Sequence, residues 1–540
     1  VCVRADATGL NDGSDWVNAF ADLQTALAAA VGSGGAITEI WVAAGTYRPT
    51  SGADRTATFA LINGVGLYGG FSGTETARSQ RNADLNVTIL SGEIGAPGAG
   101  VDSFHVVTGS GIDATAVLDG FTVTGGEATG IPPDNNGGGM ICDSGSPTVN
   151  HCVFIDNIAS RDGGGMYCVV SSPRVTGCAF IGNSSDNGGG MMNIDDSCPV
   201  VAGCAFSGNS ADLGGGMANM QTSDARVSNC DFSGNSSAGG GGGMSNESSD
   251  PFVTSCTFGG NTATVGGGGM FNDAGSGPII TNCVFAGNLS FENGGAIQNL
   301  SGSNCSVFNS TLAENRAATD GGGMANSGIS IGARVENSIF WQNVDTMGTF
   351  MDESAQIFDA VPTSMVAFSC IQGLAIFAGS NNIPDDPRFI GGPTGTWTAA
   401  GAFDADTGRT AFIDASASFP PGALVGRFLN PDTTQPLQSL IVANSANSIV
   451  VRGNFAALGP AGVAYKINDY RLMQGLSPCI DAADNMVVPA DTADLDGDGV
   501  TTEPTPLDLD GRSRFVDDPG VADTGGGAAP LVDMGAYESG

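Results

Sequence analysis

The sequence predicts an all-β fold, a right-handed parallel β-helix in which short strands stack turn upon turn along one axis. Glycine accounts for 85 of the 540 residues, yet 41% of the chain is hydrophobic. That much apolar surface excludes a disordered chain, and a chain of this length needs a core that can grow in one direction. Two motifs that recur about every 26 residues supply such a core.

The first recurring motif is the tetrapeptide Gly-Gly-Gly-Met. Its methionines follow one another at steps of 25 to 27 residues, with Ile297 of Gly-Gly-Ala-Ile taking the same place once. A period of this length is too short for a propeller blade and suits one turn of a three-sided β-coil. The methionines are Met140, Met166, Met191, Met217, Met244, Met270 and Met324. Two residues beyond them runs a second row: Cys142, Cys168, Asn193, Asn219, Asn246, Asn272, Asn299 and Asn326.

The second motif, Val-x-x-Cys-x-Phe-x-x-Asn, follows half a period later, as in VNHCVFIDN and VTGCAFIGN. Its alternation is typical of a strand with one buried face, and the asparagines and glycines mark corners. Turns stack about 4.8 Å apart, so equivalent residues should form ladders. We expect Phe and Met ladders in the core, amide-to-amide hydrogen bonds between the asparagines, and positive φ at Gly164. The rows are Cys152, Cys178, Cys204, Cys230, Cys256 and Cys283 (then Ser310 and Ser338); Phe154, Phe180, Phe206, Phe232, Phe258 and Phe285; and Asn157, Asn183, Asn209, Asn235, Asn261, Asn288, Asn315 and Asn343.

The cysteine row predicts buried free thiols. Disulfide geometry brings two Cβ atoms to about 3.8 Å, whereas stacked neighbours lie about 4.8 Å apart. Thirteen cysteines also leave at least one thiol unpaired within the chain. Five cysteines lie off the row, and a pair among them stays open: Cys2, Cys198, Cys305, Cys370 and Cys479.

These rungs resemble those of bacterial surface β-helix proteins of the polymorphic outer-membrane-protein type, within the wider pectate-lyase-like superfold. In WVNAFADLQTALAAAV the apolar residues have helical spacing, which predicts a helix within Asp15–Val31. The resemblance implies that this helix caps the open end of the coil, where unpaired strand edges would otherwise recruit other strands. We therefore expect a cap over 1–60 and the β-helix over 61–393.

Two further segments complete the predicted organisation. Residues 394–468 alternate apolar and polar positions without the coil period, which predicts a small inserted antiparallel β module. Residues 469–540 should return to the coil, because DYRLMQGLSPCIDAADN resembles the continuation of DDPRFI in related proteins, and LVDMGAYE resembles their last strand. This segment is rich in aspartate.

A candidate calcium loop lies in the C-terminal segment. Asp494, Asp496 and Asp498 alternate in the pattern D-x-D-x-D-G, so three carboxylates can converge on one hard cation and the glycine permits the turn. The backbone carbonyl of Val500 would follow as a ligand. The twelfth position is Thr505 where an EF-hand has Glu, so other oxygens are needed. Asp508 and Asp510 are the candidates, and solvated acidic turns without calcium are the alternative.

Charge restricts the partners. The chain has 18 basic and 55 acidic residues, a net charge of −37, and a surface of that sign repels nucleic acid and anionic membrane. No apolar run is long enough to span a bilayer, so direct membrane insertion is not expected. Together with the resemblance, this predicts an extracellular or cell-surface protein that contacts cell-surface glycans or other copies of itself.

The near-identity of the rungs favours a structural role. A catalytic cleft should interrupt the period, and the coil offers only the pair Asp195 and Asp196 beside isolated arginines: Arg161, Arg174 and Arg226. We therefore expect no enzymatic activity and a self-associating, calcium-stabilised matrix, filament or adhesin scaffold. The alternative is a polysaccharide lyase or hydrolase that uses a face of the β-helix, since such enzymes occur in this superfold.

The two histidines of the chain are not expected to take part in catalysis or metal binding. His105 and His151 each lie in a strand-like run, so packing or a place at the rim is expected. That argues against histidine triads and histidine-bound zinc. Self-association is expected through the exposed coil ends or through 394–468, which contains Lys466, the single lysine of the chain.

Overall fold

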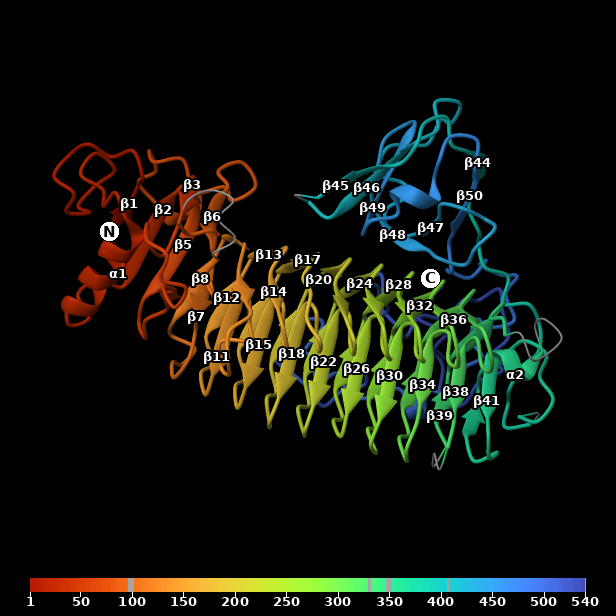
Figure 1. Ribbon diagram of the computed structural model, residues 1–540. Coiled ribbons are helices and arrows are strands. Elements are labelled where there is room, and N and C mark those ends of the chain that lie inside the picture. Colours follow the sequence, from red (N-terminus) through yellow and green to blue (C-terminus); the bar gives the residue numbers. More distant parts are fainter. Residues whose placement is uncertain (96–101, 329–331, 346–351, 378, 406, 540) are drawn as a thin grey trace. The chain divides into compact units, whose positions relative to one another are not determined.

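The computed structural model describes residues 1–95, 102–328, 332–345, 352–377, 379–405 and 407–539. It confirms the predicted fold class: the chain is an all-β, right-handed parallel β-solenoid of about 12 turns, with about 27 residues per turn and 4% helix (Figure 1). It divides into two compact units. Unit 1 comprises Val1–Ala211 and Gly216–Ala225, and unit 2 comprises Asp212–Gly215 and Arg226–Gly540.

Unit 1 contains three parallel sheets, one for each side of the coil. The first sheet runs β1 (Cys2–Val3), β2 (Glu39–Ala43), β5 (Gly66–Phe71), β8 (Val117–Asp119), β12 (Thr148–Asn150), β16 (Arg174–Thr176), β19 (Val200–Ala202). The second runs β3 (Gly45–Tyr47), β6 (Thr88–Ser91), β9 (Thr122–Thr124), β13 (Val153–Ile155), β17 (Ala179–Ile181), β20 (Ala205–Ser207). The third runs β4 (Phe59–Ala60), β7 (Val107–Thr108), β11 (Met140–Asp143), β15 (Met166–Val169), β18 (Met191–Ile194), β22 (Met217–Met220). Short strands mark one corner: β10 (Glu127–Ala128), β14 (Ile158–Ala159), β21 (Ser210–Ala211).

The predicted N-terminal helix is α1, Leu23–Gly32. The Asp22 carboxylate caps it by accepting from the Thr25 backbone N–H, which satisfies one of the free donors at the helix start. Leu23, Ala26, Leu27 and Ala30 are buried, the spacing of a single helix face, and the helix packs beside β1 and β2. A second, shorter helical element, η1 (Arg78–Gln80), lies in the connection between β5 and β6.

Unit 2 continues with the same three-sheet plan. Its first sheet runs β23 (Arg226–Ser228), β27 (Phe252–Thr254), β31 (Ile279–Thr281), β35 (Ser306–Phe308), β39 (Arg334–Glu336), β42 (Met365–Ala367). The second runs β24 (Asp231–Ser233), β28 (Thr257–Gly259), β32 (Val284–Ala286), β36 (Thr311–Ala313), β40 (Ile339–Trp341), β43 (Cys370–Ile371). The third runs β26 (Met244–Glu247), β30 (Met270–Asp273), β34 (Ile297–Asn299), β38 (Met324–Asn326), β41 (Ile357–Asp359). The remaining elements of the coil are β25 (Ser236–Ser237), β29 (Thr262–Ala263), β33 (Leu289–Ser290), β37 (Arg316–Ala317) and α2 (Glu353–Gln356).

Residues 394–468 form an antiparallel sheet within unit 2. Its strand order is β44 (Thr394–Thr396), β50 (Ala464–Asn468), β47 (Phe428–Asn430), β48 (Ser439–Asn444), β49 (Ser448–Arg452), β46 (Arg409–Ile413), β45 (Ala402–Asp404). A separate core holds it together, including Trp397, Phe412 and Ile449. The module rests on the coil beside β24 and β28, where Arg452 pairs with Asp231 at 3.4 Å (Figure 1). The short helical turn η2 (Ala456–Leu458) belongs to it.

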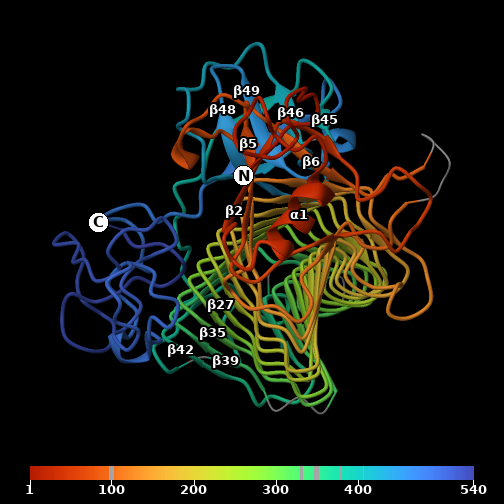
Figure 2. The same cartoon turned by 90° about the vertical axis from the view of Figure 1, so that its left-hand side faces the viewer.

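The C-terminal segment 469–539 runs outside the coil of unit 2 (Figure 2). Its buried residues pack against the second sheet, where Ala313 on β36 shares a core with Tyr537, and Ile339 on β40 shares a core with Cys479. It contains one helical turn, η3 (Asn485–Val487). The Asn337 side chain exchanges hydrogen bonds with the Asp484 backbone, at 2.9 and 2.8 Å, and the Gly535 N–H donates to the Asn337 carbonyl at 2.8 Å. Among the described residues of this segment, η3 is the one helical or strand element, and the rest consists of turns and loops.

The repeated side chains form the predicted ladders inside each unit. Stacked rings of the Phe row lie 5.0 and 4.8 Å apart in unit 1 and 4.7 and 4.4 Å apart in unit 2. Each asparagine amide donates to the next one along the row, as from Asn157 to Asn183 at 3.1 Å and from Asn261 to Asn288 at 3.0 Å. The cysteines are buried and free, and each thiol accepts from the preceding cysteine N–H, as from Cys152 to Cys178 at 3.4 Å. The core is therefore built by stacking identical residues.

The expected positive φ at Gly164 is wrong, although glycine is required at this position for another reason. Positive φ belongs to the preceding residue, Gly163, at 64°. At Gly164 a Cβ atom would lie 2.5 Å from the Ser184 carbonyl oxygen and 2.7 Å from that of Gly189. Glycine is needed there because neighbouring turns approach closely, and not for its freedom in φ. Among the helices in the described residues, none is long and apolar enough to cross a bilayer.

Candidate active site

A groove lies on the first sheet of unit 1, where the loop containing η1 overhangs β5 and β8. We call it the Arg78–Arg81 groove. Its volume is about 690 Å³, and it is lined by Glu39, Tyr68, Arg78, Ser79, Arg81, Val117, Asp119 and Asn150. Four of these side chains are charged and three more carry a hydroxyl or an amide, so the lining is suited to polar ligands.

Strand register places the floor of the groove. Tyr68 on β5 pairs with Asp119 on β8, which pairs with Asn150 on β12, so these three outward side chains follow one another along the sheet. Glu39 lies on the neighbouring strand β2, where its register partner is Gly66, two residues before Tyr68. Neighbouring strands lie about 4.8 Å apart, so the four residues span a length suited to more than one ring of a linear ligand.

The wall is the loop 72–87, in which η1 presents Arg78 and Arg81. The Glu75 carboxylate accepts from the backbone N–H groups of Ser72, Gly73 and Thr74, at 2.7 to 3.0 Å. The Gln80 side chain accepts from Thr76 and Ala77 in the same way. These hydrogen bonds fix the loop from within, so the two guanidinium groups occupy defined positions.

Each arginine of the groove pairs with one carboxylate of the floor. Arg78 lies 2.7 Å from Glu39, and Arg81 lies 2.7 Å from Asp119. Arg81 also donates to the backbone carbonyls of Gly69 and Asp119, at 3.1 and 3.0 Å, so it is held on three sides. Arg78 is less confined, with 47% of its side chain exposed, and its guanidinium stacks 4.4 Å from the centre of the Tyr68 ring. Burial, assisted by the charge of Glu39, raises the pKa of Tyr68.

The edge of the groove carries a histidine next to a buried carboxylate. His151 follows Asn150 at the end of β12, with φ of 49°, and 67% of its side chain is exposed. Its Nδ1 lies 3.5 Å from the Asp119 carboxylate, whose side chain is only 12% exposed. A fixed carboxylate that orients one ring nitrogen leaves the other, Nε2, as the atom that can take a proton. At 3.5 Å, the Asp119 carboxylate is placed where it can orient the His151 ring once the two groups close to hydrogen-bond distance.

The two histidines differ in what surrounds them. His105 is largely buried, its Nδ1 lies 3.0 Å from the Gly137 carbonyl, and burial lowers its pKa. Packing or a place at the rim was expected for both histidines, and His105 has the packing role. His151 lies at the rim, as was also expected, but its partner Asp119 makes that position chemically useful.

The predicted calcium residues separate into two groups. Asp494, Asp496 and Asp498 place carboxylate oxygens within 4.8 Å of one another. Asp508 instead accepts from the backbone of Arg512 and Glu538, at 2.8 and 2.9 Å, and Asp510 forms a bidentate pair with Arg471, at 2.6 and 2.7 Å. Val500 lies in the same exposed loop as Asp498. Calcium at Asp494, Asp496 and Asp498 stays a prediction, and its expected extension to Asp508 and Asp510 conflicts with the partners that these two residues have.

A second hollow, of about 440 Å³, lies in unit 2 where the 394–468 module meets the coil. Glu314 on its wall accepts from Lys466 at 2.9 Å, Gln438 at 2.9 Å and Asn468 at 3.0 Å. All three donors come from the module or its end, so Glu314 anchors the module to the coil. Both of its carboxylate oxygens accept from the module, which makes them poor candidates for chemistry.

The sequence reasoning missed the groove because it looked for charges inside the regular repeat. Asp119 and His151 lie where the first rungs give way to the regular ones, and Arg78 and Arg81 lie in a loop outside both motifs. The signal was available in TETARSQRNADLN, a polar stretch with two arginines between the apolar strands GLYGGF and TILS. Such an insertion into a coil is where a functional loop is expected.

No family model matches this chain, and no curated protein matches it. Among solved structures, it is similar to pectate lyase Pel9A (TM-score 0.44, 13% identity, 100% of this chain and 97% of that one). It is also similar to the A-module of the Azotobacter vinelandii mannuronan C-5 epimerase AlgE4 (TM-score 0.36, 14% identity, covering 68% and 100%). A third is the enzymatically active domain of bacteriophage CBA120 tailspike protein 2 (TM-score 0.35, 11% identity, covering 80% and 66%).

All three are named as enzymes or enzymatically active domains. The likeness concerns the fold alone, and the activity has to be argued from the chain's own residues. The expectation of a non-catalytic scaffold is corrected by a feature of the chain itself. It assumed that no loop covers a face of the coil, whereas the loop 72–87 covers the first sheet of unit 1 and forms the wall of a charged groove.

Proposed function

We propose that the chain is an extracellular polysaccharide lyase that binds a uronate-containing glycan in the Arg78–Arg81 groove. The observation that carries the proposal is the exposed His151 held against the buried Asp119 carboxylate, at one edge of a groove that also presents Arg78. A base and a cation that both reach the substrate are what β-elimination from a uronate requires.

In this reaction His151 Nε2 removes the proton on the carbon next to the uronate carboxylate. The electron pair released forms a double bond to the neighbouring ring carbon, and the glycosidic carbon–oxygen bond at that carbon breaks. The departing oxygen takes a proton from water or from the imidazolium. Arg78 lies where it can exchange Glu39 for the substrate carboxylate and stabilise the negative charge that develops there.

Hydrolysis through paired carboxylates fits the groove less well. An inverting or retaining hydrolase needs one carboxylic acid that holds a proton for the leaving group. Glu39 and Asp119 are the carboxyl groups of the groove, and each has an oxygen 2.7 Å from a guanidinium, so each is already engaged by a fixed partner. Asp119 is better suited to orienting His151 than to donating a proton.

The net charge of −37 has a consequence for a polyanionic substrate. Long-range repulsion opposes its approach, and salt screens that repulsion over about 10 Å at moderate ionic strength. Turnover should therefore increase with added salt before the ion pairs of the groove themselves weaken.

The test is an assay of the purified chain on polygalacturonate, alginate and a neutral glucan, at low and raised salt. Unsaturated uronate products, detected by ultraviolet absorbance, would support elimination. New reducing ends without unsaturation would show hydrolysis and contradict the proposed mechanism, and no depolymerisation of any substrate would contradict the proposed function.

Two variants distinguish substrate binding by Arg78 from the general effect of losing one positive charge. Arg78→Gln should raise KM for a uronate polymer by about tenfold, since it removes a charge-assisted contact of about 1.5–3 kcal/mol. Arg161→Gln is the matched control, because Arg161 is also half-exposed and paired with an aspartate, Asp162, but lies outside the groove. Equal effects of the two changes would argue against substrate binding at Arg78.

A further inference from the structure

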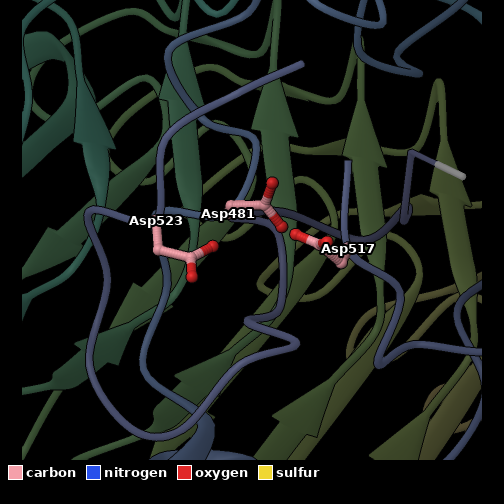
Figure 3. A group of neighbouring side chains, drawn as sticks. All are labelled: Asp481, Asp517 and Asp523. Carbon is pink, nitrogen blue, oxygen red and sulfur yellow. The ribbon is translucent and has the colours of Figure 1, made fainter. Parts of the chain in front are cut away.

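The C-terminal segment of unit 2 gathers acidic side chains at two places, apart from the groove. At the first, Asp481, Asp517 and Asp523 bring carboxylate oxygens within 4.8 Å of one another. Figure 3 shows the three converging from separate stretches of backbone, with the Asp517 carboxylate turned toward that of Asp481. Cys479 and Ile480, just before Asp481, are fully buried in a core with Ile339 and Cys370 of the coil.

Asp481 has a buried oxygen with no hydrogen-bond partner. Its side chain is 0% exposed, and its Oδ2 accepts from the Asp518 N–H at 3.3 Å, while Oδ1 has no partner among the described residues. A buried carboxylate oxygen left in this state costs free energy unless it meets a cation or a proton. Burial, with the charges of Asp517, Asp523 and Asp518, raises the pKa of Asp481 to about 6.

The second place is the predicted calcium loop, extended by two residues that the sequence motif did not include. Asp491, Asp496 and Glu503 bring oxygens within 4.8 Å of one another, and Asp496 is shared with the group of Asp494 and Asp498. The Asp491 N–H donates to the Glu503 carbonyl at 2.8 Å, which holds the two sides together.

Buried oxygens without partners occur at this second place as well. Asp491 is 1% exposed, and its Oδ1 has no partner among the described residues, while its Oδ2 accepts from the Leu495 N–H at 2.7 Å. Both carboxylate oxygens of Glu503 are buried and likewise without partners there. Within the described ranges, no ion pair joins a basic side chain to any carboxylate of either group.

We propose that the C-terminal segment binds two Ca²⁺ ions, one at Asp481, Asp517 and Asp523, and one at Asp491, Asp494, Asp496, Asp498 and Glu503. Ca²⁺ takes six to eight oxygen ligands in flexible geometry, so carboxylates from irregular loops, backbone carbonyls and water can complete each shell. Each ion would neutralise a buried carboxylate and join two stretches of the segment. The first would tie the buried turn around Cys479 to the loop 517–523, and the second would close the loop 491–503.

The two sites serve as controls for each other. Calcium is removed from the full chain with chelator, and Ca²⁺ is titrated back while the number of ions bound per chain is measured by calorimetry. The wild type should bind two. Asp523→Asn changes an exposed residue and should weaken only the first site, on the order of tenfold or more, and Asp496→Asn should do so only for the second.

The outcomes distinguish the sites. Two ions in the wild type and one in each variant at the same free Ca²⁺ would support both sites. One ion in the wild type, with no effect of Asp523→Asn, would overturn the first site, and one ion with no effect of Asp496→Asn would overturn the second. No binding at millimolar Ca²⁺ would overturn both. Because neither site contributes to the Arg78–Arg81 groove, failure here leaves the assay of lyase activity unaffected.

Discussion

The regular rungs of unit 1, from Met140 onward, and its first rungs are built on the same coil but are used differently. In the regular rungs the same corner residues recur from turn to turn. Their buried asparagine amides form hydrogen bonds to one another and to the backbone, so these groups are not available to a ligand. In the first rungs the repeat is imperfect, a loop of 16 residues (72–87) enters between β5 and β6, and four charged side chains meet over one sheet. The regular repeat thus identifies the residues of the core, and the places where the repeat is interrupted identify the candidate functional residues.

One repeat position shows the contrast directly. His151 occupies the turn position that is Gly177 and Gly203 in the next two rungs and Asn229 in unit 2, and the non-glycine residues there have φ near 50°. Glycine and asparagine are the residues that tolerate this conformation best. A histidine at this position bears a conformational cost, and beside Asp119 it gains a partner that the other rungs lack.

The largest expected effect is a loss of turnover when His151 is replaced. His151→Asn places there a residue that unit 2 already uses, so stability should change by less than about 1 kcal/mol. If His151 is the base, kcat on a uronate polymer should fall about 100- to 10,000-fold. Parallel measurements of turnover and of unfolding midpoints decide the matter, and unchanged turnover would remove His151 from the mechanism.

The next prediction compares the C-terminal segment with the regular rungs through pH. Burial raises the pKa of Asp533 to about 7, with Asp481, Glu538 and Arg514 as its charged neighbours. An unfolded aspartate titrates near about 4, so the folded chain retains a proton that the unfolded chain releases between these values. Stability from this group is therefore complete below about pH 4 and is lost as pH rises to about 7.

Asp533→Asn should accordingly flatten the decline in stability between pH 4 and pH 7 in chelator, by at most about 4 kcal/mol. Part of this gain is offset because an amide cannot accept from both the Asp481 and the Ser539 N–H groups. Denaturant unfolding at several pH values measures the slope. Asp186→Asn, an exposed carboxylate of the regular rungs, is the control, and equal slopes for the two variants would contradict the assignment.

A third change weakens the ladder itself. Asn183→Ala removes an amide that donates to Asn209 and to the Phe154 carbonyl and accepts from the N–H of Asn157. Several buried groups lose their partners at once, so unfolding should become about 3 kcal/mol easier. Asn304→Ala, at an exposed position, should stay within about 0.5 kcal/mol. Similar losses for both would mean that the ladder contributes little.

The smallest effects separate the two roles of glycine. Gly164→Ala adds a Cβ that meets two carbonyl oxygens below 3 Å, and about 2–3 kcal/mol of overpacking is expected. Gly203→Ala adds the same atom at φ of 62° with no atom within 4 Å, and only about 1 kcal/mol of backbone strain should result. Thermal or denaturant midpoints of the two variants give the comparison. A larger loss at Gly203 would restore the view that φ is the main requirement.

The sequence alone determined the coil and its ladders, because stacking makes each side chain's neighbour the residue one period away. Cys152, Phe154 and Asn157 could be placed in the core from their spacing, and α1 from the spacing of Leu23, Ala26, Leu27 and Ala30. Asp494, Asp496 and Asp498 were predicted together for the same reason, since local spacing brings their oxygens close.

Only the tertiary structure decided which residues from different rungs and loops meet. Arg81 reaches Asp119 across 38 residues, Asp119 reaches His151 across 32 more, and Asp481 meets Asp517 and Asp523 from another part of the segment. These contacts depend on how irregular loops fold back onto the sheets, which no repeat encodes. Gly163 and Gly164 make the same point on a smaller scale. Spacing marks both as a corner, but only the folded structure shows that one needs its φ and the other needs the space that a Cβ would occupy.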